Sequence, residues 1–136
     1  MDIMLLDVNN VKKIFGRGLN ATTALNGMSF NVDRGEFVAI MGESGSGKST
    51  LLNLIATYDK ATEGTITIDA QNIRQLRNKE IAYFRRDHLG FVFQDFNILP
   101  TMTNKDNILM PLVLANRSHQ TMRHRLYRLS YQLHIE

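Results

Sequence analysis

Residues 42–50 read Gly-Glu-Ser-Gly-Ser-Gly-Lys-Ser-Thr and match G-x-x-x-x-G-K-[ST], the pattern of a phosphate-binding loop. Such a loop wraps backbone N–H groups around phosphate oxygens, and glycine permits this because it has no Cβ to block the approach. The pattern predicts that Lys48 reaches the β- and γ-phosphates and that the Ser49 hydroxyl reaches Mg²⁺. It also constrains the local fold to a strand, a loop and a helix that begins at the loop.

The segments around the loop fit that order. Residues 36–41 are apolar and predict a buried strand before the loop, and residues 51–55 predict a helix after it. We expect further strands over 3–8, 11–15, 28–32, 65–69 and 89–93. Helices are expected over 73–86, in part of 107–114 with an interruption at Pro111, and over the segment that carries Met122, Leu126, Leu129 and Leu133. In the helix over 73–86, the side chains expected to face inward are Leu76, Ala82 and Phe84. This mixture predicts an α/β fold with an added antiparallel β part.

Composition limits the class of protein. The 136 residues are 43% hydrophobic and 21% charged, which is typical of one globular domain. No apolar run approaches the ~18 residues of a membrane span, and an early acidic residue argues against a signal peptide in residues 1–7. The absence of cysteine excludes disulfides and cysteine-based metal sites, as is common in cytoplasmic proteins. The net charge of +3 is too small to indicate a particular partner.

A loop of this kind needs a second acidic strand end to hold Mg²⁺ during hydrolysis. Segment 66–69 is short and close to the loop, and segment 91–95 passes through Gln94. Nothing after residue 100 is an apolar run that ends in Asp or Glu. We therefore expect this acidic element to be missing from the chain.

The phosphate loop, followed well downstream by a strand that ends Val92-Phe93-Gln94, is similar to the nucleotide-binding domain of ABC transporters. Segments 23–41, 64–69 and 85–111 also resemble that domain, as its lead-in to the loop, its next hairpin and its Q-loop region. The residue sequence of 85–111 most resembles the branch of the family that serves lipoprotein release, macrolide export and antimicrobial-peptide export. Within this branch, it is most similar to bacitracin-type exporters.

The resemblance implies a P-loop NTPase core with an antiparallel β part and the start of an α-helical subdomain, in an incomplete domain. Residues 1–136 would form the N-terminal portion of one nucleotide-binding domain. Residues 1–95 would contain the β part and the core, and 96–136 the Q-loop and the start of the helical subdomain. ATP and Mg²⁺ are the implied cofactors.

The resemblance also implies roles for individual residues. Phe15 would stack on adenine, although a packed core Phe at a strand end is the alternative. Lys48 and Gln94 would be catalytic, and Ser49 and Gln94 would approach Mg²⁺. The implied nucleotide-binding set is Phe15, Gly42, Glu43, Ser44, Gly45, Ser46, Gly47, Lys48, Ser49 and Thr50.

The implied partners are a membrane-spanning permease subunit and a second nucleotide-binding domain, with no nucleic acid. In the family, two such domains sandwich ATP, and residues 96–102 would lie near the membrane partner. The implied location is the cytoplasm, peripheral to the inner face of the cell membrane. The implied function is to couple ATP binding and hydrolysis to export of a peptide, antibiotic or lipoprotein-like substrate.

The sequence departs from the family pattern in several places. It contains no L-S-G-G-Q signature, no acidic strand followed by a catalytic Glu, and no switch His. We therefore expect residues 1–136 to bind nucleotide and to hydrolyse little of it. Missing strand partners would leave apolar faces open, so marginal stability or self-association is also expected. Ala70 stands where the family turn usually has Gly, at a penalty of about 1 kcal/mol if that turn needs φ > 0.

Two other functions remain open. One is a small P-loop nucleoside or metabolite kinase, in which Arg123, Arg125 and Arg128 would form a lid over the phosphates. The other is a non-catalytic, nucleotide-dependent interaction module, which the missing acidic element favours.

Overall fold

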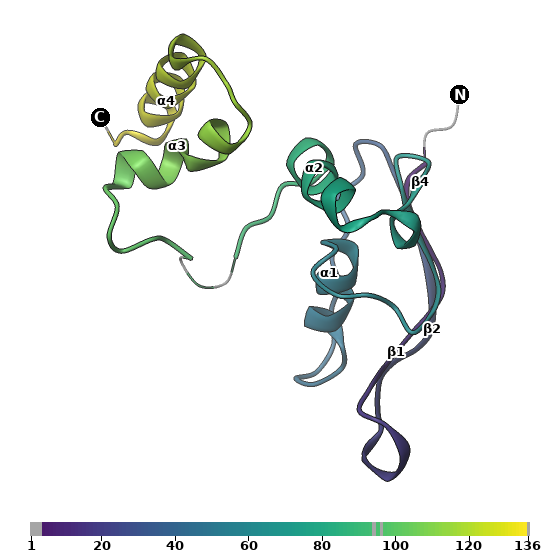
Figure 1. Cartoon of the computed structure of the whole chain (residues 1–136). Coiled ribbons are helices and arrows are strands. Elements are labelled where there is room, and N and C mark those ends of the chain that lie inside the picture. The colour runs from purple at the N-terminus through teal and green to yellow at the C-terminus, as the bar shows by residue number, and fades with distance from the viewer. Residues whose placement is uncertain (1–3, 94, 96, 136) are drawn as a thin grey trace. The chain divides into compact units, whose positions relative to one another are not determined.

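The computed structural model describes residues 4–93, 95 and 97–135. The chain divides into two compact units, one ending at Gly90 and the other beginning at Phe91. The first unit contains the sheet and the phosphate loop, and the second contains two helices, as Figure 1 shows.

The first unit is built on a four-stranded antiparallel sheet with the strand order β2-β1-β3-β4. Helices α1 and α2 pack against this sheet through a shared hydrophobic core (Figure 1). The elements are β1 (Met4–Phe15), η1 (Gly18–Asn20), β2 (Thr22–Asp33), α1 (Lys48–Ile55), β3 (Glu63–Ile68), β4 (Gln71–Asn72), η2 (Ile73–Gln75) and α2 (Asn78–His88). The core residues are Val8, Val11, Leu25, Leu51, Leu54, Ile66, Ile68, Leu76, Ile81 and Phe84.

The two N-terminal strands predicted over 3–8 and 11–15 are one strand, β1, with an irregularity between them. The register with β2 shifts between Val8 and Val11, and Asn10 has φ +46°. The backbone N–H of Asn10 donates to Ser29 Oγ at 2.8 Å. This N–H therefore has a hydrogen-bond acceptor in a side chain of β2 instead of a backbone carbonyl. Polar asparagines therefore mark a bulge, at which Val8 and Val11 both point into the core.

Two predicted strands are wrong. Segments 36–41 and 89–93 have no strand pairing in the part of the chain that the structure describes. Phe37 is 93% exposed and Met41 is 88% exposed, and of this segment Ile40 packs against the core while only partly buried. A strand needs a neighbour to pair with, and the four-stranded sheet offers none to this segment.

In α2, the predicted inward residue Ala82 is exposed, and Ile81 is buried instead. The helix begins at Asn78, after the separate turn η2. The prediction of one continuous helix over 73–86 therefore assigned the wrong residues to its inward face. Ile81 and Phe84, three residues apart, form the inward face, and Leu76 is buried before the helix begins.

The turn between β3 and β4 is a two-residue turn formed by Asp69 and Ala70. Asp69 has φ +51° and Ala70 has φ +61°, so both adopt the left-handed conformation. The sequence predicted a penalty at Ala70 if this turn needs φ > 0, and the turn does need it. Alanine therefore stands at a position where glycine would be less strained.

The second unit consists of α3 (Asn104–Leu114) and α4 (His119–Leu133), which contact each other. Thr103 caps α3 in a reciprocal pair with Asp106. The helix continues through Pro111, so the predicted interruption there is wrong. Ser118 caps α4 by accepting from the backbone N–H of Thr121 at 3.2 Å. Among the described residues, the search for a helix with the length and apolar character to cross a bilayer finds none.

Candidate functional site

The phosphate loop leads directly into α1 and packs against the sheet at Gly47. This glycine caps the helix with φ +92°, and its carbonyl accepts from the N–H of Leu51 at 2.9 Å. A Cβ built on Gly47 would lie 2.5 Å from the carbonyl oxygen of Ala24 and 2.9 Å from Leu25 Cδ2, both in β2. The glycine therefore sets both the turn into α1 and the close approach of that helix to the sheet.

The Lys48 ammonium lies inside the loop. Its Nζ donates to the carbonyl oxygens of Gly42 and Glu43 at 2.8 and 2.6 Å, and it lies 3.3 Å from Ser46 Oγ. The loop closes on itself where Ser46 N–H donates to the Glu43 carbonyl at 3.2 Å. A positive charge is thus held at the mouth of a loop whose backbone donors and helix N-terminus also favour anions.

The remaining loop residues leave the cradle open. Residues 42–46 are exposed, Ser49 is exposed in the first turn of α1, and Thr50 is half-buried. The other residues of the loop are mostly glycine and serine, so Lys48 is the long side chain that lies inside it. The sequence-predicted residues from Gly42 to Thr50 are therefore brought together on one surface.

The Ser49 hydroxyl is available as a ligand for a magnesium ion that also binds phosphates. Mg²⁺ in nucleotide sites keeps several waters and takes few protein ligands, so one hydroxyl in the first turn fits that pattern. In the described ranges, no group of three or more His, Cys, Asp or Glu side chains could hold a metal ion without a phosphate. Gln94, the other predicted magnesium ligand, lies outside the described residues.

Phe15 ends β1 and is 45% exposed, so the interpretation as a packed core residue is wrong. The Lys13 ammonium lies 4.9 Å from the centroid of its ring. Aromatic rings that are covered on one side and open on the other can stack on a planar base. The adenine-stacking role remains a prediction, and the exposure of the ring is what that role needs.

The predicted docking surface over 96–102 lies in the second unit. Phe96 lies outside the described residues, and Ile98, Leu99 and Met102 are all exposed. Asn107 ties this loop to α3, since its side chain accepts from the N–H of Leu99 at 2.7 Å. The described part of this segment, residues 97–102, therefore presents exposed apolar side chains.

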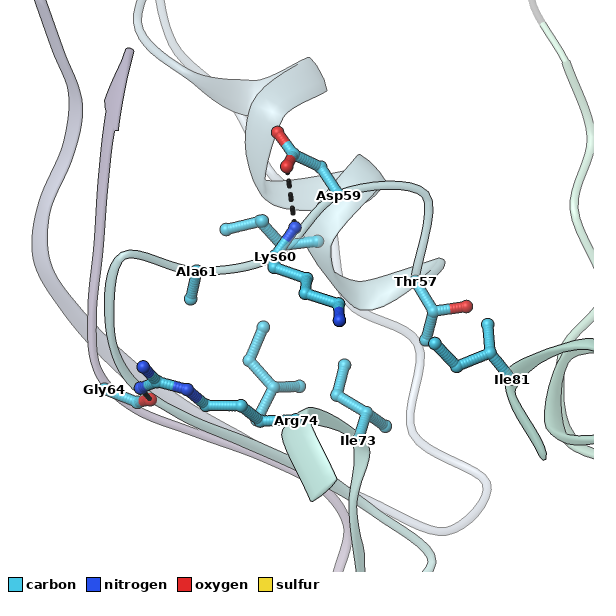
Figure 2. Close-up of a pocket in the computed structure, with 10 residues that line it drawn as sticks. Thr57, Asp59, Lys60, Ala61, Gly64, Ile73, Arg74 and Ile81 are labelled. Atoms are coloured by element: carbon cyan, nitrogen blue, oxygen red, sulfur yellow. Dashed lines mark hydrogen bonds between the residues drawn. The ribbon is translucent and has the colours of Figure 1, made fainter. Parts of the chain in front are cut away.

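A separate, mainly apolar pocket lies beyond the C-terminal end of α1 (Figure 2). Leu54, Ile66, Ile73 and Ile81 supply apolar walls. None of the sequence-predicted nucleotide-binding residues lines it, so it is distinct from the phosphate loop.

Sequence reasoning missed two residues beside the predicted site, Lys13 and Asp59. Lys13 Nζ contacts Asp59 Oδ1 at 2.6 Å, across 46 residues of sequence. The available signal was that Lys13 and Phe15 are two apart on one strand and so share a face.

Comparison with known proteins identifies the family. A sequence model of the family described as ABC transporter matches residues 25–136. The chain belongs to the ABC transporter family. The predicted fold class is confirmed: the chain is the N-terminal part of an ABC ATPase, a P-loop α/β fold with an antiparallel sheet and helices.

Three similar proteins place the chain near the export branch. It is 47% identical over 111 residues to the bacitracin export ATP-binding protein BceA of Halalkalibacterium halodurans, which covers 82% of this chain and 44% of that protein. It is 37% identical over 114 residues to the macrolide export ATP-binding/permease protein MacB of Mannheimia succiniciproducens, covering 84% of this chain and 18% of MacB. A solved dimer of the ATP-binding cassette MJ0796 of Methanocaldococcus jannaschii, bound to ADP and Pi, superimposes with a TM-score of 0.83 at 41% identity.

This alignment with the ATP-binding cassette MJ0796 covers 91% of this chain and 55% of the solved chain. The chain therefore spans about half the length of BceA and of this cassette, and a smaller share of MacB.

Proposed function

We propose that this chain binds Mg·ATP at residues 42–50 and is part of an ABC transporter ATP-binding subunit that drives export. The observation that carries the proposal is the loop geometry, with Gly47 against β2 and the Lys48 ammonium on the Gly42 and Glu43 carbonyls. A triphosphate needs a fixed cation and backbone donors at close range, and this loop supplies both.

Lys48 would neutralise phosphate charge, Ser49 would bind the phosphate-bound Mg²⁺, and Phe15 would stack on the base. Gln94 would approach the metal or the attacking water, as the family resemblance implies. The solved MJ0796 dimer is described as bound to ADP and Pi, which supports a nucleotide as the ligand of the matching loop.

The binding proposal is tested by titrating the chain with Mg·ATP and with Mg·tripolyphosphate in a calorimeter. Lys48→Met should weaken both ligands about ten- to a hundredfold, because it removes a charge-assisted hydrogen bond to phosphate. Lys79→Met is the matched control, since Lys79 is exposed on α2, away from the loop. Equal affinities of Lys48→Met and the unchanged chain would contradict the proposal.

We propose further that residues 1–136 bind ATP but hydrolyse little of it. The sequence holds the parts that neutralise phosphate charge and lacks the signature motif, the acidic strand end and the switch His. Phosphate release from Mg·ATP is the measurement, and turnover equal to that of a complete domain would refute this part. The same assay separates an ATPase from a nucleotide-dependent interaction module, and family membership argues against a small-metabolite kinase.

The proposed partners are a membrane-spanning permease and a second nucleotide-binding domain. MacB is named as an ATP-binding/permease protein, and the MJ0796 cassette is described as dimeric. BceA and MacB are both named for export, of bacitracin and of macrolides. These partners would place residues 1–136, as the N-terminal portion of one domain, at the cytoplasmic face of the cell membrane.

A further inference from the structure

Lys13 and Phe15 lie two residues apart at the end of β1, where the register with β2 is irregular between Lys13 and Ile14. The Lys13 ammonium lies 4.9 Å from the centroid of the Phe15 ring, within the range of a cation–π contact. One face of the ring is therefore covered by a fixed charge. The 45% exposure of Phe15 leaves the rest of the ring accessible.

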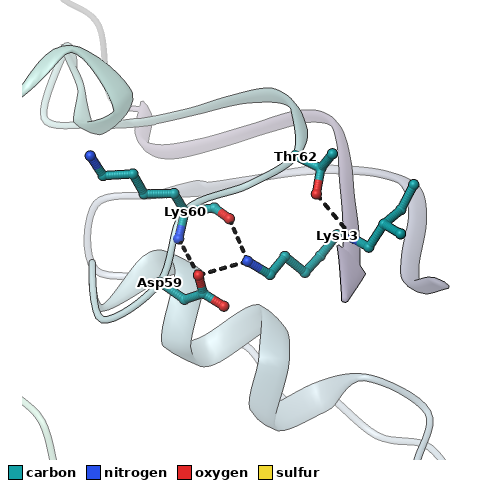
Figure 3. Close-up of polar contacts among 5 residues, drawn as sticks. Lys13, Asp59, Lys60 and Thr62 are labelled. Carbon is teal, nitrogen blue, oxygen red and sulfur yellow. Dashed lines mark hydrogen bonds and ion pairs between the residues drawn. The ribbon is translucent and has the colours of Figure 1, made fainter. Parts of the chain in front are cut away.

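The Lys13 ammonium also makes two polar contacts. Its Nζ donates to Asp59 Oδ1 at 2.6 Å and to the Lys60 carbonyl at 2.8 Å, as Figure 3 shows. Asp59 Oδ1 also accepts from the Lys60 N–H at 2.7 Å. The Lys13 side chain is only 12% exposed, so the ammonium is held by contacts on several sides.

The charge state of Asp59 suits this arrangement. Burial acts to raise the pKa of Asp59, but the hydrogen bonds from Lys13 and from the Lys60 N–H, with the Lys13 charge, outweigh burial and hold that pKa below its usual value. The carboxylate is therefore ionised at neutral pH and is a permanent partner for the ammonium.

These contacts connect the end of β1 to the segment that follows α1. Ile14 N–H donates to Thr62 Oγ1 at 3.0 Å (Figure 3), and Thr62 N–H donates to the Lys12 carbonyl at 2.8 Å. Helix α1 begins at the phosphate loop and ends a few residues before Asp59. The strand end that carries Phe15 is thus tied to the segment that leaves α1, the helix whose first turn follows the phosphate loop.

We propose that Lys13 is a positioning residue for the nucleotide base, a step that rests on the proposed ATP site. It holds the Phe15 ring on one face and fixes its orientation, so that the other face is presented to a purine. Asp59 and the Lys60 carbonyl determine where the ammonium sits. Lys13 acts through Phe15 and contributes to binding of the base rather than of the phosphates.

The test is a double-mutant cycle in which the intact 136-residue chain is titrated with Mg·ATP and with Mg·tripolyphosphate, which has no base. Phe15→Leu should weaken ATP about three- to tenfold and leave tripolyphosphate unchanged. Lys13→Met should weaken ATP about two- to fivefold, again without an effect on tripolyphosphate. In the Phe15→Leu background, Lys13→Met should cause no further loss, because the ring it positions is gone.

Lys13→Arg separates the positioning role from a structural one. Arginine keeps the charge and stacks on aromatic faces, so it should restore most of the ATP affinity that Lys13→Met loses. Asp59 stays partly hydrated and keeps its bond from the Lys60 N–H when Lys13 is replaced, so Lys13→Met should fold.

The outcomes distinguish this inference from the proposed function. A chain that binds neither ligand would overturn both. Binding of ATP and tripolyphosphate with an equal loss of both in Lys13→Met would leave the nucleotide site standing and overturn the positioning role. An undiminished Lys13→Met effect in the Phe15→Leu background would also overturn it.

Discussion

Replacing Gly47 by Ala should weaken the packing of the phosphate loop against the sheet. The loss of unfolding free energy can be worked out from the backbone conformation of Gly47 and from its closest contact. The residue has φ +92°, where an L side chain costs about 1–2 kcal/mol. The new Cβ would lie 2.5 Å from the Ala24 carbonyl oxygen, and such contacts essentially do not occur below 3.0 Å. The helix must therefore move away from β2 by about 0.5 Å or more, at an overpacking cost of about 1–3 kcal/mol.

The matched control is Gly35→Ala. Gly35 has φ +80° in the turn after β2, and a Cβ there meets nothing within 4 Å. This variant carries the conformational penalty alone, about 1–2 kcal/mol. The difference between the two variants isolates the collision between α1 and β2.

Urea unfolding at micromolar protein concentration, without nucleotide, measures both variants. At a slope of about 2 kcal/mol per molar urea, Gly47→Ala should lower the midpoint by about 1–2.5 M and Gly35→Ala by about 0.5–1 M. Calorimetric titration should then show that Gly35→Ala keeps its affinity for tripolyphosphate and that Gly47→Ala loses it. Equal midpoints for the two variants would refute the claim that Gly47 is the point of contact between loop and sheet.

Three further changes test other parts of the structure. Ala70→Gly should raise the unfolding free energy by about 0.5–1 kcal/mol, because Ala70 has φ +61°, and an unchanged urea midpoint would contradict this. Asp59 has a lowered pKa, so its ion pair adds stability above pH about 4 and loses it as the pH falls through that pKa. Asp59→Asn should therefore remove a few tenths to about 1 kcal/mol at pH 7, and this loss should shrink as the pH is lowered below about 4, measured by urea unfolding over that range. Phe37→Lys should reduce self-association in sedimentation velocity, whereas Leu19→Lys, at an isolated exposed residue, should leave it unchanged.

Local patterns in the sequence predicted the parts of the fold whose geometry is set by nearby residues. The glycine spacing of 42–50 predicted the loop and the start of α1, because backbone conformation and cap are decided within a few residues. Alternation over 28–32 and 65–69 predicted β2 and β3, whose alternate side chains face the core. The residues of Gly42–Thr50 that lie together were predicted for the same local reason.

The predictions that failed, or that were not made, depend on contacts between distant residues. Ala82 was expected to face inward because nothing in the sequence indicated the separate turn η2. The helix begins only at Asn78, so different residues face the core. The partner of Lys13 is Asp59, and no periodicity links two residues on different elements. Pairing of strands is likewise nonlocal, so an apolar run can predict a strand without revealing whether a neighbour is present.

The exposed segment 36–41 shows what the phosphate loop depends on. Its composition suits a strand buried on both faces, yet it pairs with nothing among the described residues. Phe37 and Met41 face solvent, and Ile40 is the residue of this segment that packs against the core. The loop that follows nevertheless keeps the conformation expected from its sequence, with Lys48 bound to its carbonyls. The close approach of Gly47 to β2 and the attachment of the segment after α1 to β1 supply the alternative support. The cradle in this chain is therefore held mainly from its helix side, so substitutions at Gly47 and Asp59 should disturb it more than substitutions at Phe37 or Met41.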